Sequence, residues 1–237
     1  MIDEKYIYHI DKDIAEGRDY VVYESSMDGF GNEESDIDIY IFNESTELTK
    51  DRNVTVKTIY KQKLDIENID MKYIEKIFNI LKESQDELDV FNLNWEDMKI
   101  LHRIGKSTYY SLNNPTLKEI KKYLSNIDRC IAYFHFKESL AKYNDSINFF
   151  KVKDISSAKL LIVESLISSL AAFLTTNNLV ILNKKWVITG VREINNDYLI
   201  FIIEQIFTKP LNSIDYSDLI NYSNKINKMY HYATEGR

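Results

Sequence analysis

Two aspartates, Asp36 and Asp38, stand two residues apart in a segment whose polar and apolar side chains alternate from position 36 to position 41. This alternation predicts an extended strand, with both aspartates on one face and three isoleucines on the other. The two Cα atoms would lie roughly 7 Å apart, and the carboxylates would repel each other unless a cation were near. Carboxylate oxygens are ligands that Mg²⁺ prefers, and Mg²⁺ keeps positions free for phosphate and water. The pair therefore indicates a metal-dependent site that acts on a phosphate compound.

A second alternating segment, at positions 64 to 67, supplies Asp65 and Glu67 as candidates for a third carboxylate. Three carboxylates around two metal ions suit in-line displacement at phosphorus, because one ion activates the attacking oxygen and both stabilise the transition state. Two aspartates on an alternating strand are also typical of the solvated face of an edge strand. The loop before Asp36 favours the first interpretation, since its glycines and serines can direct N–H and hydroxyl groups at a phosphate.

The segment from Ser25 to Ile39 resembles the signature of the DNA-polymerase-β-like nucleotidyltransferase superfamily. That signature has a Gly-Ser turn, a short loop with a further glycine, and Ser-Asp-x-Asp on a strand. With Ser25 on the signature serine, the loop has the length found in the aminoglycoside-adenylyltransferase branch, which often has Asp-Gly where this chain has Asp28 and Gly29. The resemblance is strong over about residues 20–70, and beyond them it is one of architecture.

The resemblance implies a function and a set of site residues. The implied activity transfers AMP from ATP to a hydroxyl of a small-molecule acceptor such as an aminoglycoside-like antibiotic, with two Mg²⁺ ions and with pyrophosphate leaving. Asp36, Asp38 and Asp65 would hold the metal ions, and Glu67 or Glu164 would accept the hydroxyl proton. The residues expected at the nucleotide are Ser25, Ser26, Gly29, Gly31, Ser35 and Lys185.

Glu24 departs from the signature, which has glycine before the serine. Glycine lets a turn approach a triphosphate closely, whereas glutamate adds bulk and a charge of the wrong sign. The retained Ser25, Ser35 and aspartates favour a Glu24 side chain that points away from the phosphates. Weakened phosphate affinity and loss of activity are the alternatives.

Two further candidates lie in the C-terminal half of the chain. Lys184 or Lys185 could neutralise triphosphate charge from the start of a helix, with Arg192 on a similar face, although a solvated basic helix start explains them equally. Glu164 interrupts the apolar run 160–174, and burial there could raise its pKa and suit it as a general base. A helix edge that meets solvent is the alternative explanation of Glu164.

The elements that must position these residues form an α+β protein. A small mixed β-sheet core with flanking helices is expected over residues 1–92, followed by a helical, substrate-binding bundle over 93–237. The change from a period of two to a helical period near Asp70 supports this division. Strands are predicted at 20–23, 36–41 and 54–69, and helices at 3–16, 73–81, 95–104, 115–143, 158–175 (capped by Ser156 or Ser157), 184–193, 198–207 and 216–230.

Composition excludes several classes of protein. The 237 residues are 44% hydrophobic and 28% charged, which argues against disorder, and six glycines and two prolines argue against collagen-like or turn-dense all-β folds. A net charge of -7 disfavours nucleic-acid binding. The single cysteine cannot form an internal disulfide, so a reducing cytoplasm is expected.

Other expectations concern partners and the remaining reactive residues. The acidic start of the chain does not fit a secretory signal, and the run 160–174 is too short to span a bilayer, so no membrane is expected. The four histidines lack metal-ligand spacing and are interpreted as ordinary residues. Expected partners are a nucleoside triphosphate and a small-molecule acceptor, with a homodimer left open. The alternatives are a toxin-type enzyme that modifies a protein or a tRNA, and a degenerate nucleotide-binding module.

Overall fold

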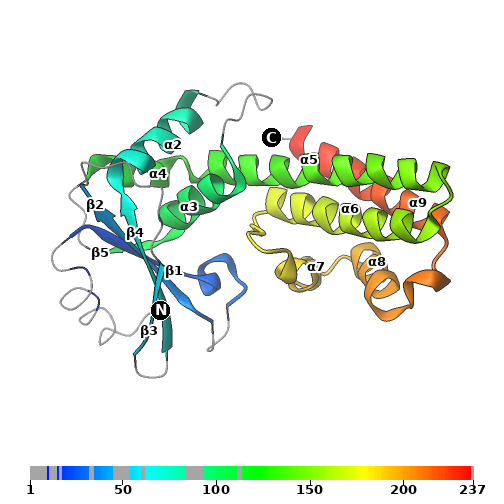
Figure 1. Cartoon of the computed structure of the whole chain (residues 1–237), viewed down its shortest axis with the longest axis horizontal. Helices are drawn as coiled ribbons and strands as arrows, with labels where there is room; N and C mark the ends of the chain where they lie inside the picture. Colours follow the sequence, from blue (N-terminus) through cyan, green and yellow to red (C-terminus); the bar gives the residue numbers. More distant parts are fainter. Residues whose placement is uncertain are drawn as a thin grey trace. The chain divides into compact units, whose positions relative to one another are not determined.

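A computed structural model describes residues 10, 15, 18–31, 35–44, 54–59, 62–83, 93–110 and 114–235. The chain forms two compact units, residues 1–127 and 128–237 (Figure 1). The boundary lies further along the chain than the one expected at residues 92 and 93. The predicted α+β class is confirmed, while the helix predicted at 3–16 lies outside the described residues apart from Ile10 and Ala15.

The first unit is built on a mixed sheet with five strands in the described residues, in the order β3-β4-β2-β1-β5. β1 lies between β2 and β5 and is antiparallel to both, whereas β2 runs parallel to β4. β3 pairs with β4 in antiparallel fashion. The strand bounds are β1 Tyr20–Glu24, β2 Ile37–Asn43, β3 Val54–Ile59, β4 Gln62–Asp70 and β5 Thr108–Tyr110.

The sequence-based prediction of one strand over 54–69 was wrong, because this segment forms the two strands β3 and β4. Positions 60 and 61, between these strands, carry none of the glycine, proline, asparagine or aspartate that usually mark a turn. The three-residue strand β5 was missed because such a short segment has no measurable period.

The alternation of β2 separates an apolar face from a polar one. Ile37, Ile39 and Ile41 are buried in a core with residues of β1 and β4, among them Tyr20 and Leu64. Burying an isoleucine side chain contributes about 1.5–3 kcal/mol, so this face fixes which way the strand faces. The aspartates are thereby held on the opposite face.

The helices of the first unit include α2 (Met71–Glu83), α3 (Trp95–Lys106) and α4 (Pro115–Lys122). A reciprocal capping box starts α3, since the Asn94 side chain accepts from the Asp97 N–H and the Asp97 carboxylate accepts from the Asn94 N–H. α3 packs against β1 and α4. Its start is therefore fixed locally, and its position over the sheet is fixed by packing.

The second unit is helical, and Figure 1 shows α5, α6 and α9 running alongside one another. The helix predicted over 115–143 is broken at Tyr123 into α4 and α5. The predicted cap of α6 was also wrong, because the Asp154 side chain accepts from the Ser157 N–H and hydroxyl. The helices are α5 Leu124–Lys151, α6 Ile155–Thr176, η3 Lys184–Trp186, α7 Val187–Ile194, α8 Asp197–Thr208, η4 Leu211–Ser213 and α9 Tyr216–Glu235.

Among the described residues, α6 is a helix long and apolar enough to cross a bilayer. It has 22 residues and extends beyond the apolar run 160–174 that was predicted to be too short to span a bilayer. However, 67% of its most apolar window is buried within the protein, as is typical of a core helix.

Candidate active site

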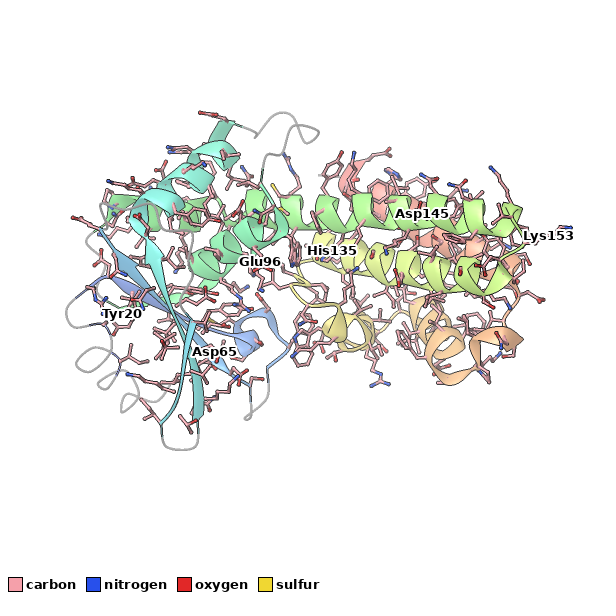
Figure 2. The ribbon with its side chains drawn as sticks, viewed as in Figure 1. Tyr20, Asp65, Glu96, His135, Asp145 and Lys153 are labelled. Atoms are coloured by element: carbon pink, nitrogen blue, oxygen red, sulfur yellow. The ribbon has the colours of Figure 1, made fainter. Side chains whose placement is uncertain are left out.

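The predicted carboxylates lie on the polar face of the sheet, where β2 and β4 run side by side. The parallel pairing places Asp38 next to Asp65, and Tyr40 next to Glu67. Asp36 precedes Asp38 by two residues and lies on the same face. Figure 2 labels Asp65 on β4. The register of two neighbouring strands thus places the four predicted carboxylates on one face of the sheet.

The electrostatics of Asp38 reflect this crowding. The pKa of Asp38 is raised to about 6: burial is the largest cause, the charges of Asp65 and Glu67 add to it, and Arg103 and Lys99 oppose it. Among the described residues, the buried atom Glu67 Oε2 has no hydrogen-bond partner, and Asp65 Oδ1 accepts no hydrogen bond but forms an ion pair with Lys63 Nζ at 3.3 Å. Buried carboxylate oxygens without a partner are costly unless a cation compensates for their charge.

Two side-chain cations contact these carboxylates. From α3, Arg103 Nη1 donates to Asp38 Oδ1 at 2.9 Å and to the Tyr40 hydroxyl at 2.6 Å. From β4, Lys63 Nζ lies 2.8 Å from Asp36 Oδ2 and 3.3 Å from Asp65 Oδ1. The protein therefore supplies part of the positive charge that the carboxylates need.

The donor set fits a hard divalent cation in its chemistry. It consists of carboxylate oxygens, the ligands that Mg²⁺ prefers, and one of them, Glu67 Oε2, is buried without a hydrogen-bond partner among the described residues. No three His, Cys, Asp or Glu side chains lie close enough together to hold a metal ion within the part of the chain that the structure describes. In this structure Asp36 pairs with Lys63, and Asp38 pairs with Arg103.

The predicted phosphate loop is a tight 3-10 turn, η2 (Ser25–Asp28), followed by two glycines. Gly29 has a φ of 87°, in the left-handed region that favours glycine. A Cβ on Gly31 would lie 2.8 Å from Ser26 Cα, so only glycine fits there without a shift of backbone. The N–H groups of Gly29 and Phe30 donate to carbonyls within the turn, at 3.0 and 3.1 Å. The Gly29 N–H is thus engaged within the turn, and the expected roles of Gly29 and Gly31 at a nucleotide stay predictions.

Ser35, expected at the nucleotide, stands directly before Asp36. Its carbonyl accepts a hydrogen bond of 2.6 Å from Gln62 Nε2 at the start of β4. This bond joins the end of the loop to the neighbouring strand beside the carboxylates.

Asp28 attaches this turn to α3. Its buried carboxylate accepts from the Tyr23 hydroxyl at 2.5 Å, and His102 Nε2 lies 3.1 Å from Oδ1 and 3.2 Å from Oδ2. Burial by itself raises the pKa of Asp28, but His102, Tyr23 and Lys106 outweigh it and hold the pKa below its usual value. Sequence analysis missed this role of His102, since its partner is 74 residues away along the chain.

Glu24 directs its carboxylate at the Ser26 side chain. Its Oε2 accepts a hydrogen bond of 2.9 Å from the Ser26 hydroxyl, so its charge lies at the turn and engages one of the hydroxyls expected at the phosphates. The φ of -131° and ψ of 146° at Glu24 are those of an extended strand, which any residue adopts. The backbone therefore does not require the glycine of the family signature at this position.

The two C-terminal candidates, Lys185 and Glu164, belong to the second unit, so their roles at the carboxylates stay predictions. Lys184 Nζ pairs with Glu138 at 2.6 Å, whereas Lys185 is exposed with its Nζ 4.9 Å from the Trp186 ring. Glu164 is 40% exposed and lies 2.7 Å from Lys142 Nζ. These surroundings match those of a helix edge that meets solvent.

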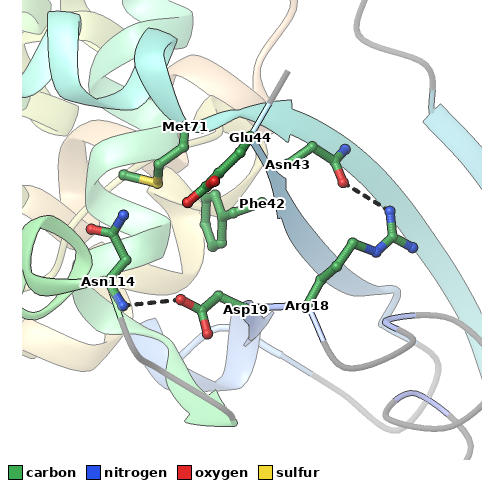
Figure 3. A pocket seen from close by; sticks show the side chains of 7 residues that line it. All are labelled: Arg18, Asp19, Phe42, Asn43, Glu44, Met71 and Asn114. Carbon is green, nitrogen blue, oxygen red and sulfur yellow. Dashed lines mark hydrogen bonds between the residues drawn. The ribbon is translucent and has the colours of Figure 1, made fainter. Parts of the chain in front are cut away.

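A separate pocket of about 480 Å³ lies at the other end of β2 from the aspartates (Figure 3). Arg18 Nη1 donates to Asn43 Oδ1 at 2.8 Å, and the Asn114 N–H donates to Asp19 Oδ2 at 3.0 Å. The pocket contains none of the predicted site residues. Its lining is Arg18, Asp19, Phe42, Asn43, Glu44, Met71 and Asn114.

Comparison of the sequence with protein-family models and with curated proteins gave no match. Among solved structures, the fold is similar to the nucleotidyltransferase-like protein from Exiguobacterium sibiricum, with a TM-score of 0.49 and 11% sequence identity. The similarity covers 98% of this chain and 74% of that one. At this level of similarity, the function of the chain has to be argued from its own residues.

Proposed function

We propose that the chain is a metal-dependent nucleotidyltransferase that transfers AMP from ATP to a hydroxyl of a small-molecule acceptor. The observation that carries this proposal is the pairing of Asp38 with Asp65, with Asp36 on the same face and directly after a glycine-bearing turn. Catalysis of phosphoryl and nucleotidyl transfer depends on positioning and on stabilising negative charge, and these carboxylates would provide both by holding a divalent cation.

In this proposal Asp36, Asp38 and Asp65 would hold Mg²⁺. The metal supplies charge stabilisation at phosphorus and lowers the pKa of the attacking hydroxyl. Arg103 keeps Asp38 oriented through its bond to Oδ1, and Glu67 would accept the hydroxyl proton; its Oε2, buried without a partner in the described residues, supports this role.

The phosphates of ATP would lie against the turn that begins at Ser25. Because the N–H groups of Gly29 and Phe30 are used within the turn, the Ser25 hydroxyl is the expected donor, and the Ser26 hydroxyl would have to leave Glu24 Oε2 to join it. An aminoglycoside-like acceptor suits the proposal because its cationic amines would be attracted to an acidic protein.

The experiment that tests the proposal incubates the protein and Mg²⁺ with ATP labelled at the α-phosphate. Three acceptor sets are offered separately: a panel of aminoglycosides and related antibiotics, a cell lysate, and RNA. Labelled antibiotic and released pyrophosphate are expected. Label confined to lysate protein or RNA would contradict the choice of acceptor, and absence of label in every set would contradict turnover.

A nucleotide-binding module without turnover is the second candidate. Arg103 on Asp38 and the Glu24 carboxylate at the turn favour it, since the first occupies a carboxylate oxygen and the second opposes phosphate charge. Calorimetry with a non-hydrolysable ATP analogue separates the two candidates. Binding without any labelled product would support the module.

Replacing Glu24 should strengthen nucleotide binding. We expect Glu24→Gln to lower the Kd for Mg²⁺ and a non-hydrolysable ATP analogue about three- to tenfold, because the substitution removes a negative charge from the turn. The effect is not larger because water and salt screen charges at the protein surface. Calorimetry measures the change, and Glu75→Gln on the exposed face of α2 is the matched control. Equal affinity of Glu24→Gln and the wild type would show that the phosphates do not bind at this turn.

A methyl group on Gly31 should disturb the same turn. Gly31→Ala forces the backbone at Ser26 to move, and overpacking of this kind costs about 1–3 kcal/mol. We expect nucleotide affinity to fall about tenfold, which corresponds to ~1.4 kcal/mol. The control is Gly190→Ala in α7, whose new Cβ meets the end of the Leu174 side chain instead of backbone. An unchanged Kd for Gly31→Ala would place the phosphates elsewhere.

A further inference from the structure

Lys63 lies between carboxylates of two strands. Its Nζ is 2.8 Å from Asp36 Oδ2 and 3.3 Å from Asp65 Oδ1. Lys63 stands two residues before Asp65, so its stem rises from the same face of β4. One ammonium group thus forms ion pairs with two of the three residues that would hold a metal ion.

We propose that Lys63 is a displaceable counter-cation: it neutralises Asp36 and Asp65 in the metal-free protein, and a divalent cation must displace it in order to bind. This inference rests on the proposed function for its metal ligands and concerns how that site is controlled. A divalent cation and the Lys63 ammonium group are both positively charged. They would therefore repel each other and compete for the same carboxylate oxygens.

The second cation of the site, Arg103, is held in place by several contacts. Its guanidinium donates to Asp38 and Tyr40, lies 5.1 Å from the centre of the Tyr23 ring, and has a side-chain exposure of 18%. These contacts come from both strands β1 and β2 and hold the planar group in one orientation.

Lys63 has the opposite surroundings. Its side chain is 46% exposed, its contacts are the two carboxylates, and it carries a compact charge on a long stem that can rotate into water. Exposed ion pairs contribute little free energy, so releasing Lys63 is inexpensive compared with releasing Arg103. The site therefore combines one fixed cation with one that can leave.

The competition predicts that removing the Lys63 charge strengthens metal binding. We expect Lys63→Met to bind Mn²⁺ at least ten times more tightly than the wild type in the absence of nucleotide, with a larger effect at low ionic strength. Lys63→Arg retains the charge and should stay within about threefold of the wild type. The matched control is Lys57→Met, an exposed lysine on β3 that pairs with Leu64 and so faces away from Asp65.

Free Mn²⁺ is measured by electron paramagnetic resonance during titration of each variant, after circular dichroism and thermal unfolding have shown that it folds. Tighter Mn²⁺ binding by Lys63→Met, and not by Lys63→Arg or Lys57→Met, supports the inference. Binding by Lys63→Met that is equal to or weaker than that of the wild type, or absent, overturns it. This measurement does not depend on turnover. If the wild type transfers label but Lys63→Met binds Mn²⁺ no more tightly, only the inference about Lys63 is wrong. If Lys63→Met binds Mn²⁺ more tightly but no label is transferred, only the proposed function is wrong.

Discussion

Asp38→Asn is expected to abolish nucleotidyl transfer, with a loss of about 10³-fold or more, equivalent to ~4 kcal/mol of transition-state stabilisation. Asp38 is the carboxylate that lies between Asp65 on the next strand and Arg103 on α3. Asparagine keeps the shape of the side chain but removes the charge that would hold a metal ion. The rate of label transfer from α-labelled ATP measures the loss.

Asp70→Asn is the matched control for this prediction. Asp70 lies on the sheet at the far end of β4, where its Oδ1 accepts from the Lys72 N–H at the start of α2. Its replacement should leave transfer within about twofold of the wild type, since it removes no charge from the site. Thermal unfolding shows whether Asp38→Asn still folds after losing its bond to Arg103. A folded Asp38→Asn that transfers label at the wild-type rate would refute the assigned role.

Asp28→Asn is expected to lower the free energy of unfolding by about 2–3 kcal/mol at pH 7, because it removes the charge from a buried hydrogen-bonded group. Asp28 contacts Tyr23 and His102, and the pKa of its carboxyl lies below the usual value. A lowered pKa stabilises the folded state above the pKa of the unfolded chain, about 3.9 for aspartate, and this contribution is lost as the pH falls through the folded value.

The pH dependence gives this prediction its test. Urea denaturation of the wild type and Asp28→Asn should show the full difference near neutral pH and a smaller one at about pH 3. Asp154→Asn is a control, since it removes an exposed charge in the second unit, while asparagine keeps an oxygen that can accept from the Ser157 N–H. A difference for Asp28→Asn that stays constant from pH 7 to about pH 3 would show that its charge does not stabilise the fold.

The alternation of residues 36–41 predicted the strand, its buried face and the shared face of Asp36 and Asp38, because each is a local consequence of an extended chain. The pairing of Asp38 with Asp65 is not local. It depends on β4 lying parallel to β2, and a shift by one residue would have turned Asp65 to the other face.

The positively charged side chains of the site differ in how far the sequence could predict them. Lys63 was within reach, because a residue two positions before Asp65 on a predicted strand must share its face. Arg103 and His102 were not, since they come from a helix whose position over the sheet is set by packing. The partners of Arg103 and His102 lie 65 and 74 residues away along the chain.

Asp36, Asp38 and Asp65 are proposed to bind a metal ion next to a nucleotide held at the turn from Ser25 to Gly31. A crystal structure with Mn²⁺ and a non-hydrolysable ATP analogue tests it most directly, because the anomalous signal of manganese locates the metal without reference to the protein. The account predicts a manganese peak bonded to these carboxylates, with the triphosphate at the turn and Lys63 turned away. A nucleotide bound elsewhere, such as in the pocket lined by Arg18, with no manganese on the three aspartates, would contradict it.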